Sequence, residues 1–227
     1  MLSSWGITFE AIDTEAQPEA MKDLARFLIP RVPAVIAGDR AVHGWNPKGV
    51  AELLGVAYNE DEPLSPEALA RRLDKYLVAA RRAVIQIPEE HLGMKTPGRD
   101  RTVHQVGYHI FRVALSYRDT MEQGYLPEEW FGENPPAGID DAAAIADYGE
   151  TVRNRLAEWL ERDEAYEGEV NTYYGPQTAP AFLERTVWHV AQHLRQIYAF
   201  LNIMDVIPEN PLTEEDFAGL PLPKNVW

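Results

Sequence analysis

The sequence contains no cysteine among its 227 residues. This absence excludes disulfide bonds, cysteine-ligated metal sites and cysteine nucleophiles in this chain. The chemistry of any functional site must therefore come from other side chains.

Basic residues are scarce relative to acidic ones, with 21 Lys and Arg against 36 Asp and Glu, so the formal net charge is −15. A field of this sign repels phosphate backbones, so no nucleic-acid partner is expected. Long apolar runs are also lacking, and none approaches the ~20 residues that a membrane-spanning helix needs. The N-terminal sequence MLSSWGITFEAIDTE lacks the basic and apolar segments of a signal peptide. We therefore expect a cytoplasmic protein without a membrane partner.

The apolar pattern divides the chain into three parts: residues 1–57, 58–205 and 206–227. The first part alternates short elements and predicts a small α/β segment, with a strand at 6–13, a helix at 18–28, a hairpin at 33–44 turning at Gly38 and Asp39, and a helix at 47–56. A polar, proline-containing link at 58–67 follows it. The third part predicts an irregular, proline-rich tail held on the body of the protein by Phe217, Leu220, Leu222 and Trp227.

Residues 58–205 predict a mainly α architecture, because apolar residues recur at helical spacing in four segments, 66–87, 101–122, 141–161 and 179–204. Ser65 and Asp140 are positioned to cap the first and third segments. Helices that each carry one apolar stripe bury it most simply in a four-helix bundle. The connections at 124–139 and 162–177 are long enough to allow a crossover.

Two histidines, His189 and His193, lie four residues apart in the fourth segment, within TVWHVAQHLRQIY. This spacing places both imidazoles on one side of a helix, beside its apolar stripe. In the second segment His109 adjoins the stripe, whereas His104 lies about 140° around the helix and is expected on the surface. Three imidazoles from two helices would make an open metal site. The spacing equally permits half-buried histidines that hydrogen-bond to neighbouring side chains.

With YHIFRV around His109 and HVAQHLRQI around His189 and His193, residues 65–205 resemble the DinB-like family. The resemblance implies a four-helix bundle with a crossover and a divalent metal ion on these three histidines. Zinc or nickel is expected, and iron or copper also suits imidazole donors. Gln105 and Gln196 are expected to lie behind the imidazoles and to orient them by hydrogen bonds.

The segment VPAVIAGDRAVHGWNP at 32–47, followed by AELLG, resembles the C-terminal part of a glutaredoxin. In glutaredoxins the proline of this VP pair, here Pro33, is cis and faces the active-site cysteines. Because this chain has no cysteine, dithiol chemistry is excluded. We expect the segment to pack on the bundle or on a partner subunit, and a homodimer is favoured because a partial sheet leaves an edge to cover.

The family resemblance leaves three functions open. The first is a metal-dependent transferase that joins a small-molecule thiol to an electrophile in detoxification or stress. The second is a hydrolase in which the metal activates water and Glu184 is the candidate base. The third is a non-enzymatic, stress-associated binding protein. The crossover residues Trp130 and Phe131 are expected to cover the site, which Tyr108, Arg112 and Trp188 could line.

Overall fold

The structure, a computed structural model, describes residues 1–3, 5–12, 14, 17–57, 64–97, 100–224 and 226. The end of the predicted strand at residue 13, most of the predicted link at 58–63 and the predicted tail contact of Trp227 lie outside these residues. Within the described ranges, no helix combines the length and the apolar character that crossing a bilayer requires.

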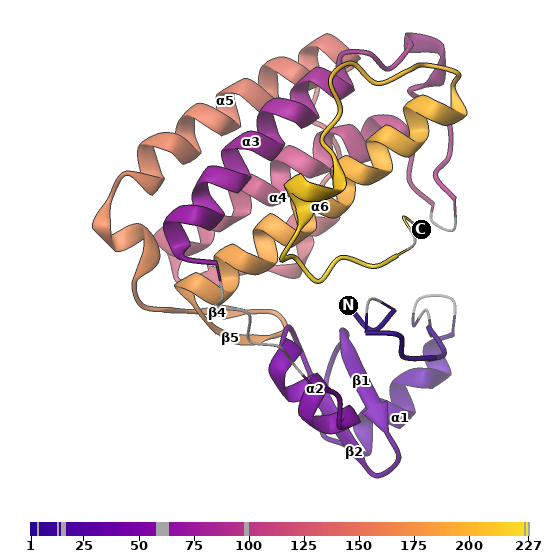
Figure 1. The fold of residues 1–227 in the computed structure, drawn as a ribbon, viewed down its shortest axis with the longest axis vertical. Helices are drawn as coiled ribbons and strands as arrows, with labels where there is room; N and C mark the ends of the chain where they lie inside the picture. The colour runs from indigo at the N-terminus through magenta and orange to yellow at the C-terminus, as the bar shows by residue number, and fades with distance from the viewer. Residues whose placement is uncertain are drawn as a thin grey trace.

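The protein is mainly helical, and four long helices form its body (Figure 1): α3 (Pro66–Val84), α4 (Val103–Gln123), α5 (Ala142–Leu160) and α6 (Ala179–Ile203). All four lie where the helical spacing predicted them. Both α3 and α4 pack against α5 and α6, so α3 and α4 face each other diagonally across the bundle. Helices consecutive in the chain are therefore not always neighbours in space, as a crossover requires.

The helix starts follow from capping side chains. The Oγ of Ser65 accepts a hydrogen bond from the Ala68 N–H at 3.3 Å, and Pro66 occupies the first turn of α3, as predicted. The prediction that Asp140 caps α5 is wrong by one residue. Asp141 is the cap, and its carboxylate accepts from the Ala144 N–H at 2.7 Å.

The apolar stripes of the four helices meet in one core. The stripe predicted for α6 is fully buried, and it consists of Phe182, Val190, Leu194, Ile197 and Leu201. The helices α4 and α5 approach so closely that a Cβ atom added at Gly149 would lie 2.5 Å from Cζ of Phe111. The spacing of α4 and α5 is thus fixed by tight packing.

Residues 1–57 follow the predicted order in part. The hairpin and the following helix are confirmed, as β1 (Ala34–Ala37), β2 (Arg40–His43) and α2 (Pro47–Leu54). The predicted helix at 18–28 is shorter, and consists of η1 (Pro18–Ala20) and α1 (Met21–Ala25). Leu28 has a φ of +59°, which a right-handed helix does not allow. The Val32–Pro33 peptide bond is cis.

The predicted strand at 6–13 is wrong for its described residues, 6–12, which have no strand conformation. A strand needs hydrogen bonds from a neighbouring strand, and the sheet of this segment contains β1 and β2 alone among the described residues. Phe9 and Ile12 remain exposed in consequence, with 50% and 46% of their surface accessible.

A small sheet that the sequence pattern did not indicate joins the two long connections. In it, β3 (Tyr125–Leu126) runs parallel to β4 (Glu169–Thr172), which pairs antiparallel with β5 (Gly175–Thr178). Strands of this length offer too few alternating positions to be recognised from sequence. Three short 3-10 helices complete the connections: η2 (Glu89–His91), η3 (Glu128–Phe131) and η4 (Asp163–Tyr166).

The C-terminal tail crosses the face made by α3 and α6 (Figure 1). It contains a short helix, α7 (Glu214–Phe217), so it is not wholly irregular. The Tyr76 hydroxyl donates to the Asp216 carbonyl at 2.7 Å, and the Tyr76 and Phe217 rings lie 5.3 Å apart. The predicted anchoring by Phe217, Leu220 and Leu222 is confirmed, since all three pack against the core.

Candidate metal centre

Three imidazoles meet where α4 and α6 pack together. One ring nitrogen from each of His109, His189 and His193 lies within 4.8 Å of the other two. The ring centroids are 4.8 to 5.6 Å apart. His109 and His193 expose 3% and 9% of their surface, and His189 is half-buried. The structure thus brings together the three histidines that the sequence singled out.

The donor set fits a divalent transition-metal ion. In a tetrahedral zinc site, two nitrogens at ~2.0–2.1 Å from the metal lie roughly 3.3 Å apart. Separations of up to 4.8 Å can therefore close by small rotations of the imidazoles. Among the described residues the group contains no carboxylate, so neutral imidazoles would leave the full charge of the cation unbalanced.

Gln196 lies directly behind one imidazole. His193 Nδ1 and Gln196 Oε1 are 2.7 Å apart, which makes the amide oxygen the acceptor and leaves Nε2 of His193 as the lone-pair donor. The Gln196 Nε2 donates in turn to the Val226 carbonyl at 3.1 Å. The C-terminal tail therefore helps to hold the amide that sets the tautomer of His193.

Gln105 has a different environment. Its Oε1 accepts from the Thr102 N–H at 2.7 Å in a capping box at the start of α4, and its Nε2 donates to Asn134 at 2.7 Å. These contacts assign Gln105 to the helix start, and its contact with an imidazole stays a prediction.

Phe131, from η3 in the crossover connection, covers the histidines. Its ring stacks on His189 with centroids 5.5 Å apart and planes at 14°, and it meets the His109 ring edge-on at 6.0 Å. Trp188 lies 6.2 Å from the His189 ring, and Trp45 of the N-terminal segment lies 5.1 Å from Trp188. The predicted covering by Phe131 and the predicted position of Trp188 are confirmed.

The connection that carries Phe131 is anchored by Arg112. This guanidinium is buried, pairs with Glu133 and lies 3.5 Å from Asp119. Trp130 packs on its face at 4.5 Å, and the covering of the histidines by Trp130 stays a prediction. Arg112 thus holds the crossover connection in place. It does not line the histidine cluster, because its two acidic partners and the Trp130 ring surround its charge.

Tyr108 faces α5. Its ring stacks on that of Tyr148 at 5.0 Å, and burial raises the pKa of both phenols. Tyr108 was predicted to line the site, and in the structure its ring packs between α4 and α5.

Two further sequence predictions concern His104 and Glu184. His104 lies outside the cluster, as expected, but it is half-buried and bonded through Nε2 to the Ile139 carbonyl at 2.7 Å, so the surface position is wrong. Glu184 is not a member of the cluster, and burial raises the pKa of its carboxyl.

Arg185, which was not predicted from the sequence, lies on α6 one turn before His189. Its guanidinium carbon is 4.2 Å from the Tyr174 ring centroid and 5.7 Å from that of Phe131. The four-residue spacing of positions 185, 189 and 193 was a signal that could have identified it.

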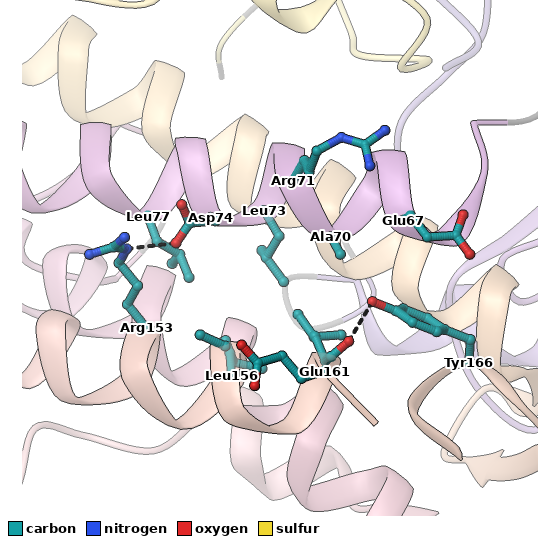
Figure 2. Close-up of a pocket in the computed structure, with 12 residues that line it drawn as sticks. Glu67, Ala70, Arg71, Leu73, Asp74, Leu77, Arg153, Leu156, Glu161 and Tyr166 are labelled. Atoms are coloured by element: carbon teal, nitrogen blue, oxygen red, sulfur yellow. Dashed lines mark hydrogen bonds and ion pairs between the residues drawn. The ribbon is translucent and has the colours of Figure 1, made fainter. Parts of the chain in front are cut away.

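A groove of about 410 Å³ lies between α3 and α5 (Figure 2). Leu73, Leu77 and Leu156 line it, and the Arg153–Asp74 ion pair of 2.6 Å spans its rim. The groove shares no residue with the histidine cluster, which lies between the other pair of helices. It supplies no chemistry to the cluster.

Comparison with known proteins agrees with this fold. The model of the DinB superfamily matches residues 62–197, more than half of the chain. The chain therefore belongs to the DinB superfamily. No curated protein sequence matches it. The match begins at residue 62, so the resemblance of residues 32–47 to a glutaredoxin stays a prediction.

Among solved structures, the crystal structure of a DinB-like protein from Bacillus subtilis is similar, with a TM-score of 0.50 and 14% sequence identity. The similarity covers 64% of this chain and 95% of the Bacillus chain. At this identity the likeness concerns the fold.

Proposed function

We propose that this protein is a divalent-metal-dependent transferase that joins a small-molecule thiol to an electrophile. The observation that carries the proposal is the convergence of three buried or half-buried imidazoles, supplied by two helices. A cation held by these nitrogens supplies an open coordination position at which a thiol loses its proton near neutral pH. Zinc or nickel is the first choice, and iron or copper also suits the donors.

The chain's own residues have separate tasks in this proposal. His109, His189 and His193 hold the cation, and Gln196 keeps the proton of His193 on Nδ1. Phe131 keeps water from the imidazoles. In the transfer, the thiol proton passes to solvent and the sulfur forms a bond to the electrophilic carbon. The leaving group departs with the electron pair of the broken bond.

Thiol transfer is favoured over hydrolysis by the composition of the cluster. Hydrolysis is commonly assisted by a carboxylate base beside the metal-bound water, and the three-histidine group contains no carboxylate among the described residues. A thiol that has lost its proton is itself a strong nucleophile and needs no such base. The alkylated product would then leave past Phe131.

Metal content is the first test. We expect protein purified without a histidine tag to carry one divalent ion per chain by elemental analysis, and we expect His189→Ala to lose it. His91→Ala is the matched control, because His91 belongs to η2 and not to the cluster. Loss of the metal in both variants, or in neither, would contradict the assignment.

Activity is tested by incubating the metal-loaded protein with a panel of thiols and a generic electrophile, followed by mass spectrometry. Conjugates that require the metal, the thiol and His189 together support the transferase. Ester or amide turnover without any thiol would instead support the hydrolase. A melting temperature that does not change on addition of zinc or nickel would support a non-enzymatic binding protein.

A further inference from the structure

Arg185 lies on the same face of α6 as two of the histidines. Positions 185, 189 and 193 follow one another at four-residue intervals, so their side chains project from one side of the helix. Arg185 precedes His189 by one turn, roughly 6 Å along the helix axis. It exposes only 9% of its surface.

Two aromatic rings lie beside the Arg185 guanidinium. Tyr174 lies 4.2 Å from it and Phe131 lies 5.7 Å away. Burial raises the pKa of the Tyr174 phenol to about 12, so this neighbour is uncharged at neutral pH. The rings contribute dispersion and cation–π attraction, but neither offers a negative charge.

No carboxylate forms an ion pair with Arg185 in the part of the chain that the structure describes. Arg112 shows what a buried arginine does elsewhere in this protein, since it pairs with Glu133 and Asp119. The chain carries 36 acidic residues against 21 basic ones, so a lack of acidic side chains does not explain the difference. A buried charge without a counter-ion is costly, and a bound anion would remove that cost.

The ring of Phe131 connects Arg185 with the metal centre. It stacks on His189 at 5.5 Å and also lies beside the Arg185 guanidinium. Displacement of this one ring would therefore open one side of His189 and one side of the guanidinium together. With a divalent ion on neutral imidazoles, both uncovered groups are positive.

We propose that Arg185 and the three histidines form one composite site for a thiol that carries a carboxylate. The sulfur lies at the imidazoles, and the carboxylate accepts hydrogen bonds from the guanidinium fork. This inference rests on the proposed function, and it names the substrate class of that site.

The test uses probes that differ in one charge. The full-length protein is loaded with nickel or cobalt, and metal binding is first measured by calorimetry. Two matched pairs are then titrated: 3-mercaptopropionate against 3-mercaptopropanol, and the same pair one methylene longer. Binding is followed by the sulfur-to-metal charge-transfer absorption, which requires no turnover.

We expect at least one carboxylate probe to bind about tenfold more tightly than its neutral partner. Arg185→Met, which keeps much of the packing against the rings, should remove this preference. It should leave the affinities for the metal and for the neutral thiol unchanged. Arg155→Met, an equal change of charge at an exposed position on α5, should keep the preference. Arg185→Lys should keep part of it, because a lysine retains the charge without the fork.

Each other result has a distinct meaning. Absence of metal binding, or metal binding without binding of either thiol, would contradict the proposed function and with it this inference. Metal and thiol binding with equal affinity for both members of each pair would overturn the anion site alone. An Arg185→Met protein that binds all thiols equally less well would show a structural role. If Arg185→Met does not fold, the comparison of charged and neutral thiols on the unaltered protein still tests the anion site.

Discussion

The contact between His193 and Gln196 allows the sharpest test of the metal centre. The perturbation is Gln196→Ala, which removes the acceptor that lies 2.7 Å from His193 Nδ1. Without this acceptor the imidazole can turn about its χ2 angle and can carry its proton on the other nitrogen. Both changes disfavour the arrangement in which Nε2 faces a cation.

The magnitude follows from the nature of this hydrogen bond. A neutral hydrogen bond contributes about 0.5–1.5 kcal/mol, and one to a charged group about 1.5–3 kcal/mol. A cation on Nε2 would polarise the Nδ1–H bond. The lost free energy of metal binding should therefore lie where these two ranges meet, at about 1.5 kcal/mol. This corresponds to a roughly tenfold weaker affinity for zinc or nickel. The assay is competition with a chromogenic chelator at fixed pH.

Gln192→Ala is a closely matched control. The Gln192 Nε2 also donates to the Val226 carbonyl, at 2.8 Å, but no contact with a histidine is found for it among the described residues. The Gln192 Oε1 also accepts from Arg195 at 2.9 Å, so the control removes this contact together with the tail contact. Neither contact involves a histidine, and the metal affinity of Gln192→Ala should stay within about twofold of the unaltered protein. An unchanged affinity in Gln196→Ala, or an equal loss in both variants, would refute the reasoning.

Two further predictions concern stability. Gly149→Ala should lower the free energy of unfolding by about 1–3 kcal/mol in a denaturant titration, because the new methyl group would meet the buried Phe111 ring at 2.5 Å. Gly107→Ala, whose nearest neighbour is 3.4 Å away, should be neutral or stabilising, and equal effects of the two changes would contradict the packing argument. Glu184→Gln should raise the melting temperature at pH 7, because burial raises the folded-state pKa of this carboxyl and so disfavours its charged form. The gain should shrink as the pH falls through that raised pKa and vanish below the unfolded value. The control is Glu158→Gln, which removes one charge at an exposed position of α5.

The helices and the histidine triad could be predicted from the sequence because both depend on local periodicity. A stripe such as Phe182, Val190 and Leu194 has one interpretation at helical spacing, and the four-residue interval of His189 and His193 fixes their common face. The pairing with His109 came from its place beside the stripe of another helix, and the packing of α4 against α6 agrees with it.

The errors arose where a position depends on distant parts of the chain. The segment at 6–13 alternates like a strand, but its described residues have no neighbouring strand to pair with. The contact of Gln105 with an imidazole stays a prediction, and the structure shows that its amide oxygen accepts from the Thr102 N–H in the capping box. The Gln105 amide nitrogen donates a hydrogen bond to Asn134 on the crossover connection.

Thus the order of apolar and polar residues along the chain determined a mainly helical protein with three histidines able to meet, since a helix relates each residue to those three and four positions away. Tertiary packing alone decided what surrounds those imidazoles. Phe131 reaches them from a connection 58 residues before His189, and the Val226 carbonyl supports Gln196 from 30 residues further along. Arg185 is left without an acidic partner among the described residues for the same reason. Sequence spacing carries no information about which distant backbone will come to lie beside a side chain.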